Sequence, residues 1–215
     1  SVAGGTLTKT EDCPSNVFAT LNPLDTGNGT DFSSLLSEGN LTLGGSANDL
    51  GLRGTLGANS GKFYWEVKAN DNGDTLCVAR SDVRLTINNT SGTPSAGFWS
   101  IQSNGTGASL NVCDNGTFSN NGALQGFASN TIIGIALDMD NGKVYYSFNG
   151  VFKDRANQNS DPVNQTYPFF SSLPTDGTFI MPYTENRSSG GSTFWNYGNG
   201  YFGTTAVSSA GTNAS

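Results

Sequence analysis

The stretch TIIGIALDMDNGKVYYSFNG, residues 131–150, decides the fold. Two runs of alternating apolar residues flank Asp140-Asn141-Gly142. Asn-Gly between such runs is a strong signal for a β-hairpin, because both central residues of its tight turn must accept positive φ. The sequence therefore predicts two antiparallel strands joined at this point.

The faces of these two strands follow from the alternation of side chains along a strand. On the second strand, we expect Tyr146 and Phe148 to point into a core and Tyr145 to point into water. On the first strand, large aliphatic residues alternate with Gly134 and Ala136. Small side chains leave room on that face for another backbone or for a large aromatic residue.

A second strand is predicted at SGKFYWEV, residues 60–67, where Phe63 and Trp65 alternate with polar neighbours. We expect both to be core residues, and Trp65 to be a central element of the core rather than a ligand platform. Short alternating runs recur about every ten residues between clusters of Gly, Asn, Asp and Pro. The predicted fold is all-β: a two-sheet antiparallel β-sandwich without a long helix.

Length and composition fit one such domain. The chain has 215 residues, and only 13% are charged where about 25% is usual. Both ends are small and polar, so we expect an arm at residues 1–12, the sandwich at 13–203 and a tail at 204–215.

The net charge of -7 excludes several partners. Nucleic acids and anionic membranes attract Lys and Arg, which number only ten. The chain contains no apolar run of eighteen residues that could span a bilayer, and Ser-Val-Ala-Gly-Gly at its start does not resemble a signal peptide. We expect neither nucleic-acid binding nor membrane insertion.

Nucleophilic catalysis is also disfavoured. There is no histidine, which excludes Ser-His and Cys-His mechanisms. Cys13, Cys77 and Cys113 are too widely spaced for a zinc site and are odd in number, so we expect buried free thiols.

Carboxylates leave two alternatives open. Asp138 and Asp140 could form a glycosidase pair, but we favour a role in shaping the end of the hairpin. Four aspartates in Asn- and Gly-rich segments could bind calcium, although solvated carboxylates explain them better: Asp71, Asp74, Asp114 and Asp161. We expect no catalytic residue, no metal and no cofactor.

Several of these motifs together resemble the SPRY family, which has a concanavalin-like jelly-roll fold. They are Gly61 to Glu66, Ile133 to Gly142, and Tyr146 to Gly150. Further matches follow in the family order: Ala96-Gly97-Phe98, Asn104-Gly105, Asn121-Gly122, Pro168, Pro174, Pro182 and Trp195-Asn196-Tyr197-Gly198. The chain departs mildly at Asn130-Thr131, where the family often has Gly-Asp, and at Tyr197, where it often has Phe.

The opening CPSNVFATLNPL, residues 13–24, resembles the divergent branch of this family in bacteriophage structural proteins. That resemblance implies a non-enzymatic module on a tail, fibre or capsid, assembled in the host cytoplasm and located on the virion. Its partners would be other virion subunits, a host-surface protein or a glycan, in a homo-oligomeric assembly. A glycan-binding lectin is the alternative, followed by a carbohydrate-active enzyme.

Three residues are candidates for binding: Tyr145, Trp99 and Arg84. Exposed aromatic rings stack on sugars or anchor a protein partner. The competing interpretation makes Trp99 a core residue and Arg84 an ordinary solvated charge.

Overall fold

The computed structural model of the chain describes residues 18–26, 35–44, 50–69, 74–83, 96–103, 108–186 and 192–207. Every regular secondary-structure element in these segments is a β-strand. They are β1 (Leu21–Thr26), β2 (Leu36–Ser37), β3 (Thr42–Leu43), β4 (Leu50–Gly54), β5 (Lys62–Ala69), β6 (Asp74–Arg80), β7 (Phe98–Gln102), β8 (Ser109–Asp114), β9 (Thr117–Gln125), β10 (Ile132–Asp138), β11 (Lys143–Phe148), β12 (Val151–Lys153), β13 (Ile180–Asn186), β14 (Thr193–Asn196), β15 (Tyr201–Phe202) and β16 (Thr205–Ala206).

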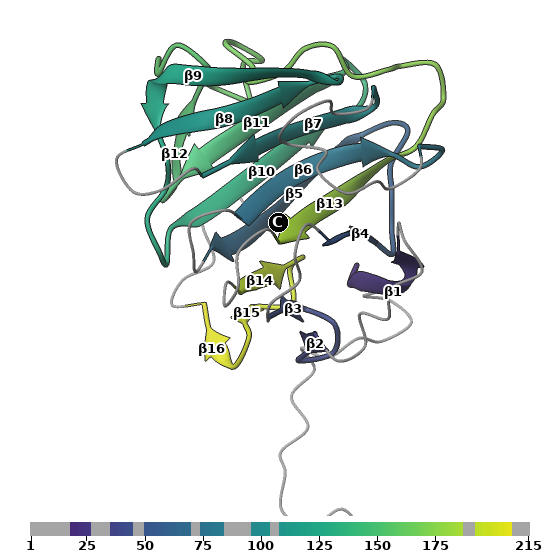
Figure 1. Cartoon of the computed structure of the whole chain (residues 1–215). Coiled ribbons are helices and arrows are strands. Elements are labelled where there is room, and N and C mark those ends of the chain that lie inside the picture. The colour runs from purple at the N-terminus through teal and green to yellow at the C-terminus, as the bar shows by residue number, and fades with distance from the viewer. Residues whose placement is uncertain are drawn as a thin grey trace, which may run out of the picture.

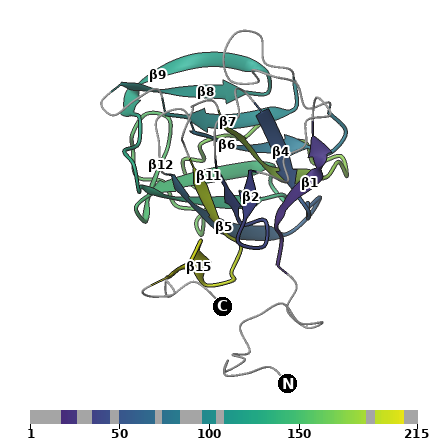
Figure 2. The same ribbon diagram turned by 60° about the horizontal axis from the view of Figure 1, so that its bottom comes forward.

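These strands form two stacked layers (Figures 1 and 2). One seven-stranded sheet has the order β1-β4-β13-β6-β7-β8-β9, and the other has the order β12-β11-β10-β5-β14-β3-β2. Neighbouring strands pair in the antiparallel sense throughout. The predicted antiparallel β-sandwich is confirmed.

The hairpin of β10 and β11 lies in the second sheet between β12 and the central strand β5. Ile135 faces Tyr146 across the pair, and β10 is paired on its other side with β5, where Ile135 faces Trp65. Trp65 and Tyr146 are buried, as predicted, in the cluster that fills the space between the sheets. Phe148 is partly buried and packs against the same cluster.

The turn of this hairpin differs from the predicted one. Asp138 pairs with Lys143, so four residues form the connection, and of the Asn141-Gly142 pair only Gly142 has positive φ, at 61°. The Asp138 carboxylate accepts hydrogen bonds from the Asn141 backbone N–H, at 3.2 Å, and from its side-chain amide, at 3.0 Å. The connection is therefore a four-residue loop capped by a carboxylate, and the predicted two-residue turn is wrong.

Two-residue turns with positive φ at both positions occur at other Asn-Gly pairs. Asn115-Gly116 joins β8 to β9 with φ values of 48° and 85°, and Asn149-Gly150 joins β11 to β12 with 50° and 83°. Both are consistent with the mirror-image turns that suit twisted hairpins.

The second face of β11 is not in water, and that prediction for Tyr145 is wrong. Tyr145 is fully buried, and Ser147 is 1% exposed. Residues that follow β12 return to this face, where Lys143 Nζ donates to the Gln165 carbonyl oxygen at 3.2 Å. Burial, together with the carboxylates of Asp138 and Asp161, raises the pKa of Tyr145 to about 12.

The small residues of β10 have the predicted consequence. A Cβ added at Gly134 would lie 2.5 Å from the hydroxyl oxygen of Tyr64 and 2.4 Å from that of Ser147. The Tyr64 ring therefore lies close against the backbone here, as expected for a glycine next to a large aromatic residue.

The described cysteines are buried free thiols, as predicted: Cys77 in β6 and Cys113 in β8. Each is paired with Ser100 of the intervening strand β7. Burial raises the pKa of Cys77 well above its usual value and that of Cys113 to about 11. Cys13 lies outside the described residues.

At the C-terminal side, β15 and β16 form a separate two-stranded hairpin. β16 lies within the segment predicted to be a tail, and Val207 N donates to the Gly200 carbonyl oxygen at 2.9 Å. Within the segments that the structure describes, no helix has the length and hydrophobicity to cross a lipid bilayer.

Substituting alanine for glycine at two turns should separate backbone strain from steric contact. A Cβ at Gly142 would lie 2.5 Å from the Leu173 carbonyl oxygen, whereas one at Gly150, where φ is 83°, meets nothing within 4 Å. Gly150→Ala should lower the free energy of unfolding by about 1 kcal/mol through φ alone, and Gly142→Ala by about 3 kcal/mol. Urea unfolding measures both, and equal losses would contradict the described contact.

The thiols should be inert while the protein is folded, because the thiolate is the reactive form and burial disfavours it. In a Cys13→Ser variant, we expect the native protein not to react with Ellman's reagent at neutral pH, and both remaining thiols to react after denaturation in guanidinium chloride. A rapidly reacting thiol in the native variant would contradict the described burial of Cys77 and Cys113.

Candidate functional site

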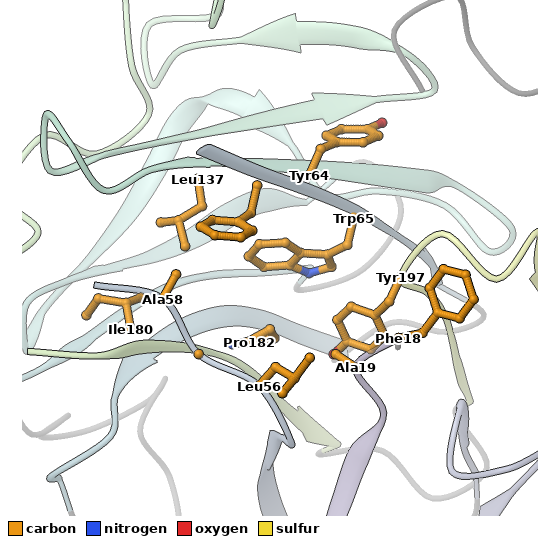
Figure 3. A pocket seen from close by; sticks show the side chains of 12 residues that line it. Phe18, Ala19, Leu56, Ala58, Tyr64, Trp65, Leu137, Ile180, Pro182 and Tyr197 are labelled. Atoms are coloured by element: carbon orange, nitrogen blue, oxygen red, sulfur yellow. The ribbon is translucent and has the colours of Figure 1, made fainter. Parts of the chain in front are cut away.

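An apolar pocket opens between the two sheets at one end of the sandwich (Figure 3), with a volume of about 340 Å³. Its lining comes from residues 18–19, the connection between β4 and β5, the start of β5, one position of β10 and two of β13, together with Tyr197 after β14. Both sheets thus contribute to one hollow, which we call the inter-sheet pocket.

The connection between β4 and β5 forms one wall because it is paired with β13. Ala58 N donates to the Ile180 carbonyl oxygen at 2.9 Å, and Ile180 N donates to that of Ala58 at 2.8 Å. At Gly57 the backbones approach so closely that a Cβ would lie 2.8 Å from the Met181 side chain and 3.1 Å from the Ile180 carbonyl oxygen. This pairing fixes Leu56 at the rim, where it is 49% exposed.

The start of β5 forms the opposite rim. Gly61 N donates to Asp140 Oδ1 at 2.6 Å, and Met139 N donates to the Gly61 carbonyl oxygen at 2.9 Å, so the β10–β11 turn holds this strand end. Phe63 follows and is 49% exposed. The prediction that Phe63 is a core residue is wrong, because its strand begins where the two sheets open.

Two aromatic residues form the inner surface of the pocket. Trp65 is buried, and its indole nitrogen lies on the ring edge that faces Pro182 and Leu56 (Figure 3). The Tyr197 ring lies 6.4 Å from that of Trp65 and stacks on Trp195 at 5.6 Å. The Tyr64 ring points away from the pocket (Figure 3).

The side chains that line the pocket are suited to binding an apolar group and not to catalysis. All twelve lining residues are uncharged, and their only ionisable groups are the hydroxyls of Tyr197 and of Tyr64, whose ring points away from the pocket. Tyr64 Oη donates to Glu66 Oε1 at 2.7 Å, and burial, helped by Glu66, raises the pKa of Tyr64. An uncharged concave site of this kind binds apolar groups.

Two of the three binding candidates from the sequence, Tyr145 and Trp99, do not line this pocket. Tyr145 is buried on the outer face of its sheet, and Trp99 is buried in the inter-sheet core, so neither exposes its ring. The core interpretation of Trp99 is the correct one. Arg84 lies outside the described residues.

Trp99 is held in a chain of hydrogen bonds that closes one edge of the sandwich. Trp99 Nε1 donates to Ser172 Oγ at 2.7 Å, and Ser172 Oγ donates to Asp114 Oδ1 at 2.7 Å. Arg155 forms an ion pair with the other oxygen of Asp114 at 2.9 Å. Asp114 therefore has a structural role.

Three further candidate aspartates, all among the described residues, also have partners within the chain. Asp138 caps the turn and pairs with Lys62 at 3.4 Å, and Asp140 holds Gly61, so their expected role in shaping the hairpin end is confirmed. Asp161 accepts hydrogen bonds from the backbone of Val163 and Asn164.

Of the other two calcium candidates, Asp74 is buried in β6 and Asp71 lies outside the described residues. Among the residues that the structure describes, no group of three or more acidic or Cys side chains could hold a metal ion.

Sequence reasoning missed the rim of the pocket. Leu56 is a single large apolar residue in the Gly- and Thr-containing connection GTLG, residues 54–57, and that isolation was an available signal. Pro182 and Tyr197 were noted only as motif positions, because the sequence does not reveal that they lie beside Trp65.

Comparisons with known proteins agree on one family. The model of the SPRY domain matches residues 62–184. Among solved structures, the chain is similar to the TRIM65 PSpry domain, with 18% identity and a TM-score of 0.56, over 83% of this chain and 91% of that one. It is also similar to the SPRY domain of human HERC1, with 18% identity and a TM-score of 0.57, over 83% of this chain and 98% of that one.

Proposed function

The chain belongs to the SPRY domain family, and we propose that it is a non-catalytic module that binds another protein through the inter-sheet pocket. Domains of this family are generally protein-interaction modules without catalytic activity. The observation that carries the proposal is the rim of the pocket, where Leu56 and Phe63 each remain about half exposed above a buried tryptophan. Apolar side chains that surround a hollow are typical of an interaction site.

The described residues that line the pocket include no carboxylate, thiol or cationic group, which supports this function. The chain has no histidine. Both carboxylates considered for glycosidase chemistry serve the β10–β11 turn, and the described thiols are buried with raised pKa values. Two residues considered for glycan binding, Tyr145 and Trp99, do not offer a ring surface on which a sugar could stack, because both rings are buried.

We also propose, from the sequence resemblance alone, that the module belongs to a bacteriophage particle and contacts virion subunits or the host surface as part of a homo-oligomeric assembly. The low content of charged residues, 13%, and the opening of residues 13–24 support this context. Mass spectrometry of purified particles would test the location, and sedimentation velocity would test the assembly.

A charge placed at the rim should abolish partner binding. Leu56→Asp introduces a carboxylate beside an apolar pocket, and its burial by a partner would be unfavourable. Peptides selected from a random display library on the wild-type protein should bind this variant at least about tenfold more weakly. Because Leu56 is half exposed, Tm should change by no more than about 2 °C.

The matched control is Leu24→Asp, the same substitution at a residue that is 90% exposed and does not line the pocket. It should bind the selected peptides as the wild type does. Equal binding by the Leu56→Asp variant, or failure of the wild type to select any peptide, would refute the proposed site.

A further inference from the structure

The three tryptophans of the chain differ in how their indole N–H groups are satisfied. Trp99 Nε1 donates to Ser172 Oγ at 2.7 Å, and Trp195 Nε1 donates to Thr193 Oγ1 at 3.0 Å. The buried Nε1 of Trp65 has no acceptor within the described part of the chain. Burying a donor without a partner is unfavourable by about 1–3 kcal/mol. The tryptophan that lines the pocket is therefore the one whose indole N–H lacks an acceptor among the described residues.

A second donor lies nearby. The hydroxyl of Tyr197 is buried and also lacks a partner among the described residues. A Cβ built on Gly54 would lie 3.3 Å from this hydroxyl and 3.4 Å from the Pro182 side chain, which places the hydroxyl beside a lining residue. Burial raises the pKa of Tyr197 well above its usual value, so the hydroxyl keeps its proton and can donate.

The surroundings of these two donors favour an uncharged hydrogen-bond acceptor. A carboxylate could accept both hydrogen bonds, but its burial without a cation is strongly unfavourable. None of the described residues that line the pocket is charged, so none of them could compensate an anion there. A neutral acceptor, such as an amide carbonyl, matches both the donors and the apolar lining.

We propose that the inter-sheet pocket binds a peptide segment of a partner protein, which inserts an aliphatic side chain and presents a backbone carbonyl to Trp65 Nε1 and the Tyr197 hydroxyl. This inference rests on the proposed function and specifies the ligand. A peptide fits better than a free small molecule because the apolar surface continues outward onto Leu56 and Phe63, where a longer segment would cover it.

The indole N–H resonances provide the test. In ¹H–¹⁵N spectra, the three signals can be assigned with Trp→Phe variants. Titration with N-acetyl-leucine methylamide should shift the Trp65 signal saturably and leave those of Trp99 and Trp195 in place, because their N–H groups already have acceptors. N-acetyl-glycine methylamide, which lacks the aliphatic side chain, should bind more weakly.

Two variants remove the donors while keeping an aromatic ring. Trp65→Phe and Tyr197→Phe should each lower the affinity for N-acetyl-leucine methylamide by about three- to tenfold in ligand-observed titrations. This is the effect of losing one net hydrogen bond. Tyr197→Phe removes a buried unpaired hydroxyl, so its Tm should be unchanged or higher, and it serves if the Trp65→Phe variant does not fold.

Several outcomes would overturn the inference. They are the absence of a saturable Trp65 shift, unchanged probe affinity in both variants, and equally tight binding of methylcyclohexane, which would indicate an apolar pocket without acceptor preference. A Trp65 shift on simple dilution of the protein would instead indicate a second copy as the occupant. If Leu56→Asp abolishes peptide binding while the Phe variants do not weaken the probe, only this inference fails and the proposed function stands.

Discussion

The pairing of β10 with strands on both sides is the constraint on which the rest of the structure depends. Every second residue of β10 is large and faces the core, and the residues between them are small. A shift of one residue would turn Gly134 and Ala136 inward and put the large side chains where Tyr64 now packs against the backbone. One register therefore fixes both the central core and the position of Trp65 opposite Ile135.

The sequence predicted what depends on local alternation and failed where distant segments intervene. Trp65 and Tyr146 were identified correctly because strand periodicity alone places them. The burial of Tyr145 was not predicted, because residues that follow β12 cover its face of the sheet. Those residues have no strand pattern from which this contact could be predicted. Phe63 has the right alternation for the core, but its position at a strand end leaves it half exposed. The turn at residues 139–142 depends on the capping carboxylate of Asp138, which a two-residue Asn-Gly rule does not include.

The same strand end explains why a pocket exists at this place. Two sheets that close over a core must separate where their strands begin and end. Here the β4–β5 connection pairs with Ile180, and the β10–β11 turn holds Gly61. These connections therefore surround the opening and do not fill it. The residues that form the rim thus belong to connections, whereas the residues that form the inner surface belong to the sheets. A rigid inner surface with a rim set by loops is a common arrangement of binding sites.

The hydrogen bonds of the tryptophans link this architecture to its function. Trp99 and Trp195 lie in the same sandwich as Trp65, and each has a hydroxyl acceptor within about 3 Å. The fold can therefore satisfy a buried indole when the ring serves only packing. A phenylalanine at residue 65 would supply an apolar ring without an unsatisfied donor. The stability lost at Trp65 and at the Tyr197 hydroxyl is recovered only if an acceptor enters the pocket, so the same two groups that weaken the free protein would favour its complex.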